Sequence, residues 1–317
     1  MVRVWIPSSY NDGDETAVMV VLDGGLANDG VHFEFGSDPA PGFNMLENLM
    51  GSDNDERSLP SFIVITYMHD VGGSIESLST RFLECRNGGG TERYNQYAVM
   101  SDKFARYVDD EIFSFVTNHP EIKRKYPNLS ITDDPAGRAV LGCSTSGVAA
   151  LQMAFFRPDL FGIVIAYSTT LVYFKGDPEI SDLYPLGHAD FWVPKPKGKD
   201  LIRSESKKDI RIFHSVGERD NVNLDLEYGD WVVANNETAK ALTSMGYETR
   251  YAYGLEAVHC DVPMIMQDKS NSMVWAWAKW KQKHASTTKS AKKGAKKGAK
   301  KGSKKGSKKV KKSKTAK

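Results

Sequence analysis

Cysteines and long apolar segments are scarce in this sequence. Its 317 residues include 3 cysteines, too few for a disulfide framework, and contain no run of about 18 apolar residues that would span a membrane. Neither C-x-x-C nor H-E-x-x-H spacing occurs, so we expect no metal site. The first residues, Met1–Pro7, alternate like a strand and lack the features of a signal peptide. This predicts a cytoplasmic protein, unless the true start lies upstream.

Acidic residues are absent from the C-terminal segment Ala285–Lys317, which contains 15 lysines in a near-repeat of Ala/Ser-Lys-Lys-Gly. Of the 42 basic residues, 27 remain in the rest of the chain against 40 acidic ones, a net charge of −13. With one valine and no aromatic residue, the segment buries too little apolar surface to offset the entropy of ordering. We expect residues 285–317 to be disordered and to contact polyanions such as nucleic acid, or to act as a solubilising appendage.

Short apolar segments alternate with helical patterns along the rest of the chain. The predicted strands are Ala17–Asp23, Phe62–Met68, Arg138–Gly142, Gly162–Tyr167, Asp209–Ser215 and Glu248–Tyr253. The predicted helices are Ser101–Val116, Gly147–Phe156, Asp230–Met245 and Ser270–Lys283. Most strands are apolar on both faces, which indicates an α/β fold with a mostly parallel, doubly wound sheet and helices on both faces. We expect one domain over residues 1–284, with segment 170–200 as a cap over the site.

Six small residues follow the predicted strand that ends near Gly142. They read Gly142-Cys143-Ser144-Thr145-Ser146-Gly147, close to the G-x-S-x-G pattern with its last glycine displaced by one position. A tight strand-to-helix turn of this kind requires small neighbours and exposes a serine nucleophile, so Ser144 is the candidate. Ser146 is a rival nucleophile, and an ordinary tight turn is the alternative reading.

A triad of this fold follows the chain order serine, acid, histidine, with acid and base on loops after late strands. Asp220 lies after the strand Asp209–Ser215 and is the predicted acid. The alternatives are Glu218, then Asp225 and Glu227. His259 follows the next strand and is the predicted general base, which takes the Ser144 proton and returns it to the leaving group.

Acyl transfer also requires N–H donors aimed at the developing oxyanion. The backbone N–H of Thr145, the residue after the nucleophile, is one predicted donor. The second is expected after the early strand, where glycines let the backbone turn its N–H inward. Gly25 is the candidate and Leu26 the alternative. Cys143 and Cys260 adjoin Ser144 and His259 and could lie near each other, but we expect both to be buried free thiols.

Several further motifs occur in order along the chain. They are Val4-Trp5-Ile6-Pro7, Leu22-Asp23-Gly24-Gly25, Arg93-Tyr94-Asn95-Gln96-Tyr97, Ser101-Asp102-x-Phe104-Ala105-Arg106, Ile131-Thr132-Asp133-Asp134-Pro135-x-Gly137-Arg138-Ala139, Arg157-Pro158-Asp159-x-Phe161 and Gly229-Asp230-Trp231-x-x-Ala234-Asn235. With the Ser144 turn and His259, they make the chain similar to the Putative esterase family of α/β-hydrolases, the esterase D and enterochelin-esterase-like group, over Val2 to Lys281. The resemblance departs at the end of the turn, where Ser146-Gly147 replaces the family's Gly-Gly.

The resemblance implies hydrolysis of a carboxylic ester by a Ser-Asp-His triad without a cofactor. The expected partner is a small-molecule or carbohydrate-type ester. The alternative enzyme is an acyltransferase, because related mycolyltransferases pass the acyl group to a sugar. The non-enzymatic alternative is a hydrolase-fold scaffold that binds polyanions through its basic tail.

Overall fold

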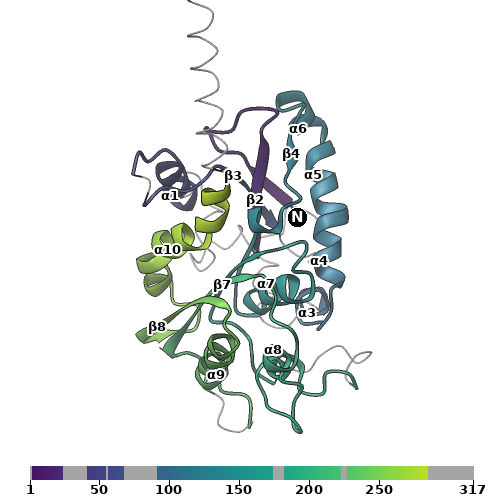
Figure 1. Ribbon diagram of the computed structural model, residues 1–317, viewed down its shortest axis with the longest axis vertical. Helices are drawn as coiled ribbons and strands as arrows, with labels where there is room; N and C mark the ends of the chain where they lie inside the picture. Colours follow the sequence, from purple (N-terminus) through teal and green to yellow (C-terminus); the bar gives the residue numbers. More distant parts are fainter. Residues whose placement is uncertain are drawn as a thin grey trace, which may run out of the picture. The chain divides into compact units, whose positions relative to one another are not determined.

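The computed structural model describes residues 2–23, 41–54, 56–67, 91–173, 182–222 and 227–284 (Figure 1). The chain divides into two compact units, Met1–Trp277 and Ala278–Lys317. The first unit contains the sheet, and the described part of the second is the helical segment 278–284. The expected basic tail, residues 285–317, lies outside the described residues. None of the described helices is both long and apolar enough to cross a membrane.

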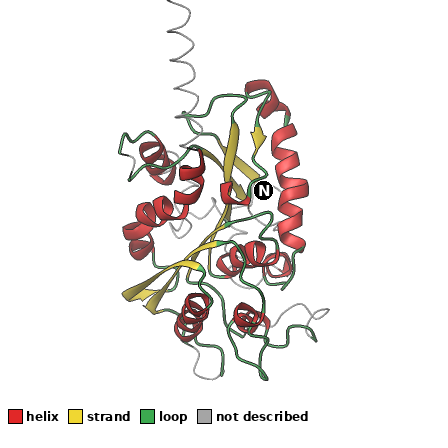
Figure 2. Ribbon diagram, viewed as in Figure 1, coloured by secondary structure: helices red, strands yellow, loops and turns green. Residues whose placement is uncertain are grey.

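Among the described residues, one sheet of eight strands forms the centre of the first unit (Figure 2). Its strands are β1 (Val2–Trp5), β2 (Glu15–Leu22), β3 (Phe62–Tyr67), β4 (Ser130–Ile131), β5 (Arg138–Cys143), β6 (Ile163–Tyr167), β7 (Arg211–Arg219) and β8 (Glu248–Val258). The order is β1-β3-β2-β5-β6-β7-β8, with β4 beside β2, and every pair is parallel except β1 with β3. The predicted α/β fold is therefore confirmed.

The middle strands are buried on both faces because helices cover the sheet from both sides. Every residue of β3, β5 and β6 is buried, which matches their continuous apolar sequences. The described helices are α1 (Pro41–Met50), α3 (Thr91–Tyr97), α4 (Lys103–Tyr107), α5 (Ser114–Asn118), α6 (Pro120–Lys125), α7 (Thr145–Phe156), α8 (Leu201–Ser204), α9 (Trp231–Ser244) and α10 (Val262–Ala276). In Figure 1, α10 lies on the other side of the sheet from α7 and α9.

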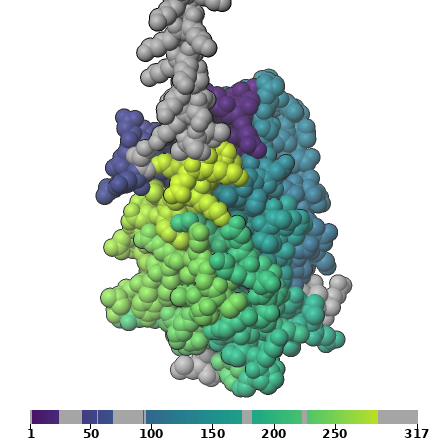
Figure 3. Space-filling model, viewed as in Figure 1, coloured from purple at the N-terminus to yellow at the C-terminus, as the bar shows by residue number. Residues whose placement is uncertain are grey.

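The helix expected at Ser101–Val116 runs instead from Lys103 to Asn118, and it consists of α4 and α5 joined by a π-helical turn at Val108–Phe113. A π-helical turn contains one residue more than an α-helical turn. The apolar stripe after the turn is therefore rotated around the helix axis relative to the stripe before it. Figure 3 shows this helical segment as blue surface beside the green surface of residues further along the chain.

The last predicted helix, Ser270–Lys283, has the wrong bounds. Helix α10 begins at Val262, where the carboxylate of Asp261 accepts a hydrogen bond from the N–H of Met264 at 2.9 Å. It ends at Ala276, and the helical residues 278–284 belong to the second unit. The apolar spacing indicated one helix across both segments, whereas the aspartate that starts α10 belongs to the loop after His259.

Strand β7 contains a buried histidine, His214, which is 3% exposed. Its ring lies 4.6 Å from the ring of Tyr251 on β8, and its Nε2 has no hydrogen-bond partner among the described residues. Burial lowers the pKa of His214 to about 3, because no nearby group compensates the loss of hydration of the imidazolium.

The free energy of unfolding should therefore decrease in mild acid, because His214 binds a proton in the unfolded chain and not in the folded one. The folded chain keeps this ring neutral, while the unfolded chain protonates it below its ordinary pKa of about 6.5, so stability is lost as the pH falls from there toward 3. We expect the wild type to lose about 2 kcal/mol more than His214→Phe between pH 7.5 and pH 5. Urea unfolding of both proteins at the two pH values measures the difference, and equal losses would contradict the prediction.

Candidate active site

Ser144 is the single residue that connects the end of β5 at Cys143 to the start of α7 at Thr145. Its φ is 63° and its ψ is −127°, a conformation that is rare for a residue with a side chain and clusters at functional sites. Backbone hydrogen bonds hold it there: its N–H donates to Tyr167 at 3.0 Å, and its carbonyl accepts from the N–H of Thr170 at 3.2 Å. The serine is half-buried at the carboxyl edge of the sheet.

The turn at Ser144 is too tight for larger neighbours. A Cβ atom on Gly142 would lie 2.3 Å from the carbonyl oxygen of Ser146, and one on Gly147 would lie 3.2 Å from that of Tyr167. The helix therefore comes back against the strand within four residues. This close approach is the physical reason for small residues on both sides of the serine.

Ser146, the rival nucleophile, is fully buried and has both of its hydrogen-bonding roles filled. Its Oγ donates to the carbonyl of Cys143 at 2.7 Å and accepts from the N–H of the same residue at 3.1 Å. The hydroxyl closes the turn where the related family has a glycine. A serine here therefore reinforces the turn and leaves Ser144 as the more accessible hydroxyl.

Asp220 and His259 come together although 39 residues separate them in the chain. Asp220 directly follows β7, His259 directly follows β8, and these parallel strands end at the same edge of the sheet. The His259 Nδ1 lies 2.6 Å from Asp220 Oδ1. A proton on Nδ1 leaves Nε2 as the acceptor, which is the tautomer that a general base requires.

Asp220 is an anion at neutral pH in this setting. Burial has the largest single effect and raises its pKa, but its polar partners together outweigh burial and hold the pKa below its usual range, with the hydrogen bond to His259 first among them. The hydroxyl of Ser168 and the N–H of Asn221, 2.7 Å from Oδ1, lower the pKa further. A buried carboxylate with these partners orients the imidazole and stabilises its charged form.

The structure describes two of the three alternative acids, and neither of these two is paired with His259. Glu218 is exposed and accepts a hydrogen bond from the N–H of Glu256 at 2.8 Å. Glu227 forms an ion pair with Lys197. Asp225 lies outside the described residues.

The predicted oxyanion donors are partly described. Thr145 is the first residue of α7, where backbone N–H groups have no partner within the helix. Gly25 and Leu26 lie outside the described residues, which end on this side at Asp23, after β2. Asp23 is buried with a φ of 54° and forms an ion pair of 2.6 Å with Arg93 on α3.

Cys143 and Cys260 form a disulfide, so the expectation of two free thiols is wrong. Their Cα atoms are 6.1 Å apart although 117 residues separate them in the sequence. Spacing along the chain did not indicate the bond, because Cys143 at the end of β5 and Cys260 after β8 meet only in the folded protein, although β6 and β7 lie between the two strands. The available signal was that each cysteine adjoins a predicted catalytic residue.

Two side chains beside His259 were missed by the sequence reasoning. Ser168, directly after β6, has a φ of 44°, and its Oγ accepts a hydrogen bond from the N–H of Cys260 at 2.9 Å. The ring of Trp231, at the start of α9, meets the His259 ring edge to face at 4.5 Å. A polar residue directly after a central parallel strand was the signal that could have identified Ser168.

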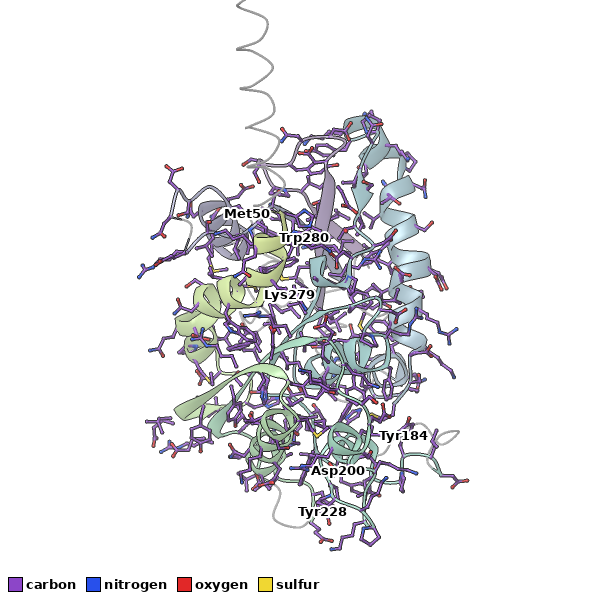
Figure 4. All side chains as sticks on the ribbon, viewed as in Figure 1. Met50, Tyr184, Asp200, Tyr228, Lys279 and Trp280 are labelled. Atoms are coloured by element: carbon purple, nitrogen blue, oxygen red, sulfur yellow. A yellow bond between two sulfur atoms is a disulfide. The ribbon has the colours of Figure 1, made fainter. Side chains whose placement is uncertain are left out.

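Part of the predicted cap approaches the same loops. Tyr173 donates its N–H to the carbonyl of Tyr228 at 2.8 Å, and the ring of Trp192 lies 5.7 Å from that of Tyr228. Tyr228 precedes Trp231 by three residues, and Figure 4 shows its side chain at the same end of the first unit as that of Asp200. Residues 174–181 of the segment lie outside the described residues.

The described residues contain no group of three side chains suited to a metal ion.

The model of one protein family, described as Putative esterase, matches residues 1–259. No match was found among the curated proteins. Among solved structures, the chain is similar to a ferulic acid esterase, with 17% identity, a TM-score of 0.52 and coverage of 87% of this chain and 91% of that one. It is also similar to the BES protein from Bacillus cereus, with 15% identity, a TM-score of 0.53 and coverage of 87% and 88%.

A third similar structure is the enterobactin esterase FES from Shigella flexneri in the presence of enterobactin, with 15% identity and a TM-score of 0.52. The match covers 88% of this chain and 55% of that one, so the chain spans about half the length of that esterase. At these identities the likeness shows the shared α/β-hydrolase fold.

The tight contact at Gly142 gives a test of the turn. We expect Gly142→Ala to lower the free energy of unfolding by about 3 kcal/mol or more, because the added Cβ meets backbone atoms that cannot move separately. Gly246→Ala is the matched control: its Cβ meets no atom within 4 Å, and only its φ of 69° opposes the change, at about 1 kcal/mol. Urea unfolding measures both, and equal losses would contradict the packing argument.

Proposed function

The chain belongs to the Putative esterase family and is an ester hydrolase, and we propose that it is a serine carboxylesterase that acts through an acyl-serine intermediate on Ser144. The hydrogen bond of 2.6 Å between His259 and the buried Asp220 carries this proposal. It provides an oriented base at the sheet edge where the Ser144 turn lies, and the Cys143–Cys260 disulfide joins the two loops.

In the proposed reaction, the Ser144 Oγ attacks the carbonyl carbon of the ester while its proton passes to His259 Nε2. The carbonyl oxygen becomes an oxyanion, to which the N–H of Thr145 donates a hydrogen bond. His259 then gives its proton to the departing alcohol, which leaves an acyl-serine. A water molecule repeats the sequence, and the carboxylic acid is released.

Asp220 stays ionised throughout and stabilises the imidazolium that forms on His259. The second oxyanion donor is proposed to be Gly25, with Leu26 as the alternative. Segment 170–200 is proposed as the cap over the acyl site, which its described contacts with Tyr228 support. Acyl transfer to an alcohol would use the same steps with an alcohol in place of water.

Two further expectations stay predictions. A disulfide persists in oxidising compartments and is rare in the cytosol, so the Cys143–Cys260 bond does not favour the cytoplasmic location predicted from the sequence. Polyanion contact through residues 285–317 has no support from the proteins to which the chain is similar.

Substitution of Ser144 tests the nucleophile. Ser144→Ala should lower kcat for p-nitrophenyl acetate by several orders of magnitude, because no acyl-enzyme can form, and it should abolish covalent labelling by a fluorophosphonate probe. Ser146→Gly, which restores the family's Gly-Gly ending, should keep both. Labelling that survives Ser144→Ala, or is lost only in Ser146→Gly, would refute the assignment.

Two matched acid-to-amide changes test the third member of the triad. Asp220→Asn should reduce kcat by about 10⁴-fold, because an amide at this place favours the wrong imidazole tautomer. Glu218→Gln, two residues away, should stay within about twofold of the wild type, since its amide oxygen can still accept from the N–H of Glu256. Steady-state kinetics at pH 8 compares them, and a reversed order of the two losses would assign the acid to Glu218.

A further inference from the structure

The disulfide between Cys143 and Cys260 joins the two residues that adjoin the proposed nucleophile and base. Cys143 is the last residue of β5 and precedes Ser144, while Cys260 follows His259. We propose that this bond is a positioning element of the active site: it holds the His259 loop against the Ser144 turn, and turnover requires it. The proposal rests on the assignment of Ser144 and His259 given above.

Apart from the disulfide, mainly polar contacts restrain the loop that holds His259. The N–H of Glu256 donates to Glu218 at 2.8 Å, the N–H of Val258 donates to Asp261 at 3.2 Å, and His259 itself contacts Asp220 and Trp231. Among the described strands β8 lies at the outer end of the sheet, and the pairing of β7 with β8 is irregular between Gly217 and Arg219. Beyond that point the side chains of Leu255 and Val258 are 76% and 51% exposed, so little apolar packing fixes the chain just before His259. A segment of this kind moves easily unless something else ties it down.

The backbone near His259 is also in an unfavourable conformation. Glu256 has a φ of 59° and Cys260 a φ of 50°, and neither is a glycine. Such conformations persist only where the surrounding structure determines them. Besides the disulfide, a hydrogen bond of 2.9 Å from the N–H of Cys260 to Ser168 Oγ holds this residue. The covalent bond is therefore the stronger of the two restraints.

The other end of the disulfide lies in the buried centre of the sheet. Strand β5 is central and buried throughout, and Cys143 is bonded through its N–H and its carbonyl to the Ser146 hydroxyl. The disulfide thus fixes the position of the His259 loop relative to the Ser144 turn. Proton transfer from Ser144 to His259 requires the two side chains within hydrogen-bond reach, and a displacement of about 1 Å at a reacting group can reduce the rate a hundredfold.

The bridge stays out of contact with solvent, which suits a permanent restraint. Cys143 is fully buried and Cys260 is 5% exposed. Neither sulfur takes part in the acyl transfer. Both cysteines are positioning residues, and their removal should reduce the rate of the chemical step with little effect on substrate binding.

The experiment compares the full chain with Cys143→Ala, Cys260→Ala and the double variant. We expect kcat for p-nitrophenyl acetate and the rate of fluorophosphonate labelling to fall together by about tenfold or more, with KM within twofold. Each single variant should lose as much as the double variant, because either change breaks the same bond. Losses that add, or a kcat within twofold of the wild type, would overturn the proposal.

Leu242→Ala serves as the stability control. Leu242 is buried in α9, close to the turn that leads into the amino end of β8, whereas His259 follows the carboxyl end of that strand. The variant should have a lower melting temperature but an unchanged kcat at 20 °C. If it loses kcat as the cysteine variants do, the disulfide acts through global stability alone and the proposal fails.

Reduction of the wild type repeats the test where a variant does not fold. Because the bridge is buried, the protein is reduced in mild urea and returned to urea-free buffer, and its two new thiols are counted before activity is measured. Dithiothreitol supplies two electrons and two protons, which convert the bridge to two thiols while the reagent closes to its cyclic disulfide. Activity should fall with unchanged circular dichroism and return on oxidation, and the double variant should not respond. A reduced protein with full activity overturns the proposal. A wild type that neither turns over esters nor labels refutes the proposed function itself.

Discussion

The close contact between β5 and α7 at Gly142 is the constraint on which the proposed site depends. The helix begins so near the strand that Ser144 must adopt a positive φ, and this conformation presents its side chain at the carboxyl edge of the sheet. The Ser146 hydroxyl closes the turn from inside by bonding Cys143 twice. The place of the proposed nucleophile is therefore determined by backbone packing and not by the serine itself.

The partners of the serine depend on the parallel order of the strands. Because β5, β6, β7 and β8 are neighbours and run the same way, the residues that follow each of them meet at one edge. Ser144, Ser168, Asp220 and His259 are the residues at or just past these four ends. A buried carboxylate could not stay ionised there alone, and the imidazole that it orients also offsets its loss of hydration.

The sequence was sufficient for the fold and for the pairing of Asp220 with His259, because buried strands and their order leave clear local patterns. It was insufficient where the deciding interaction joins distant residues. Cys143 and Cys260 meet across 117 residues, and the Ser168 contact exists only once β6 lies beside β7. The predicted bounds of α10 were wrong because the capping residue Asp261 starts the helix directly after the loop of His259, eight residues before the apolar spacing that predicted it.

The irregular pairing at the end of β8 has a second consequence. An outer strand presents a row of unpaired backbone groups that can join another sheet, edge to edge, and start aggregation. Here the shift between Gly217 and Arg219 and the positive φ of Glu256 interrupt that row just where the side chains become exposed and apolar. The irregular backbone before His259 thus also hinders the pairing of another strand with the edge of β8.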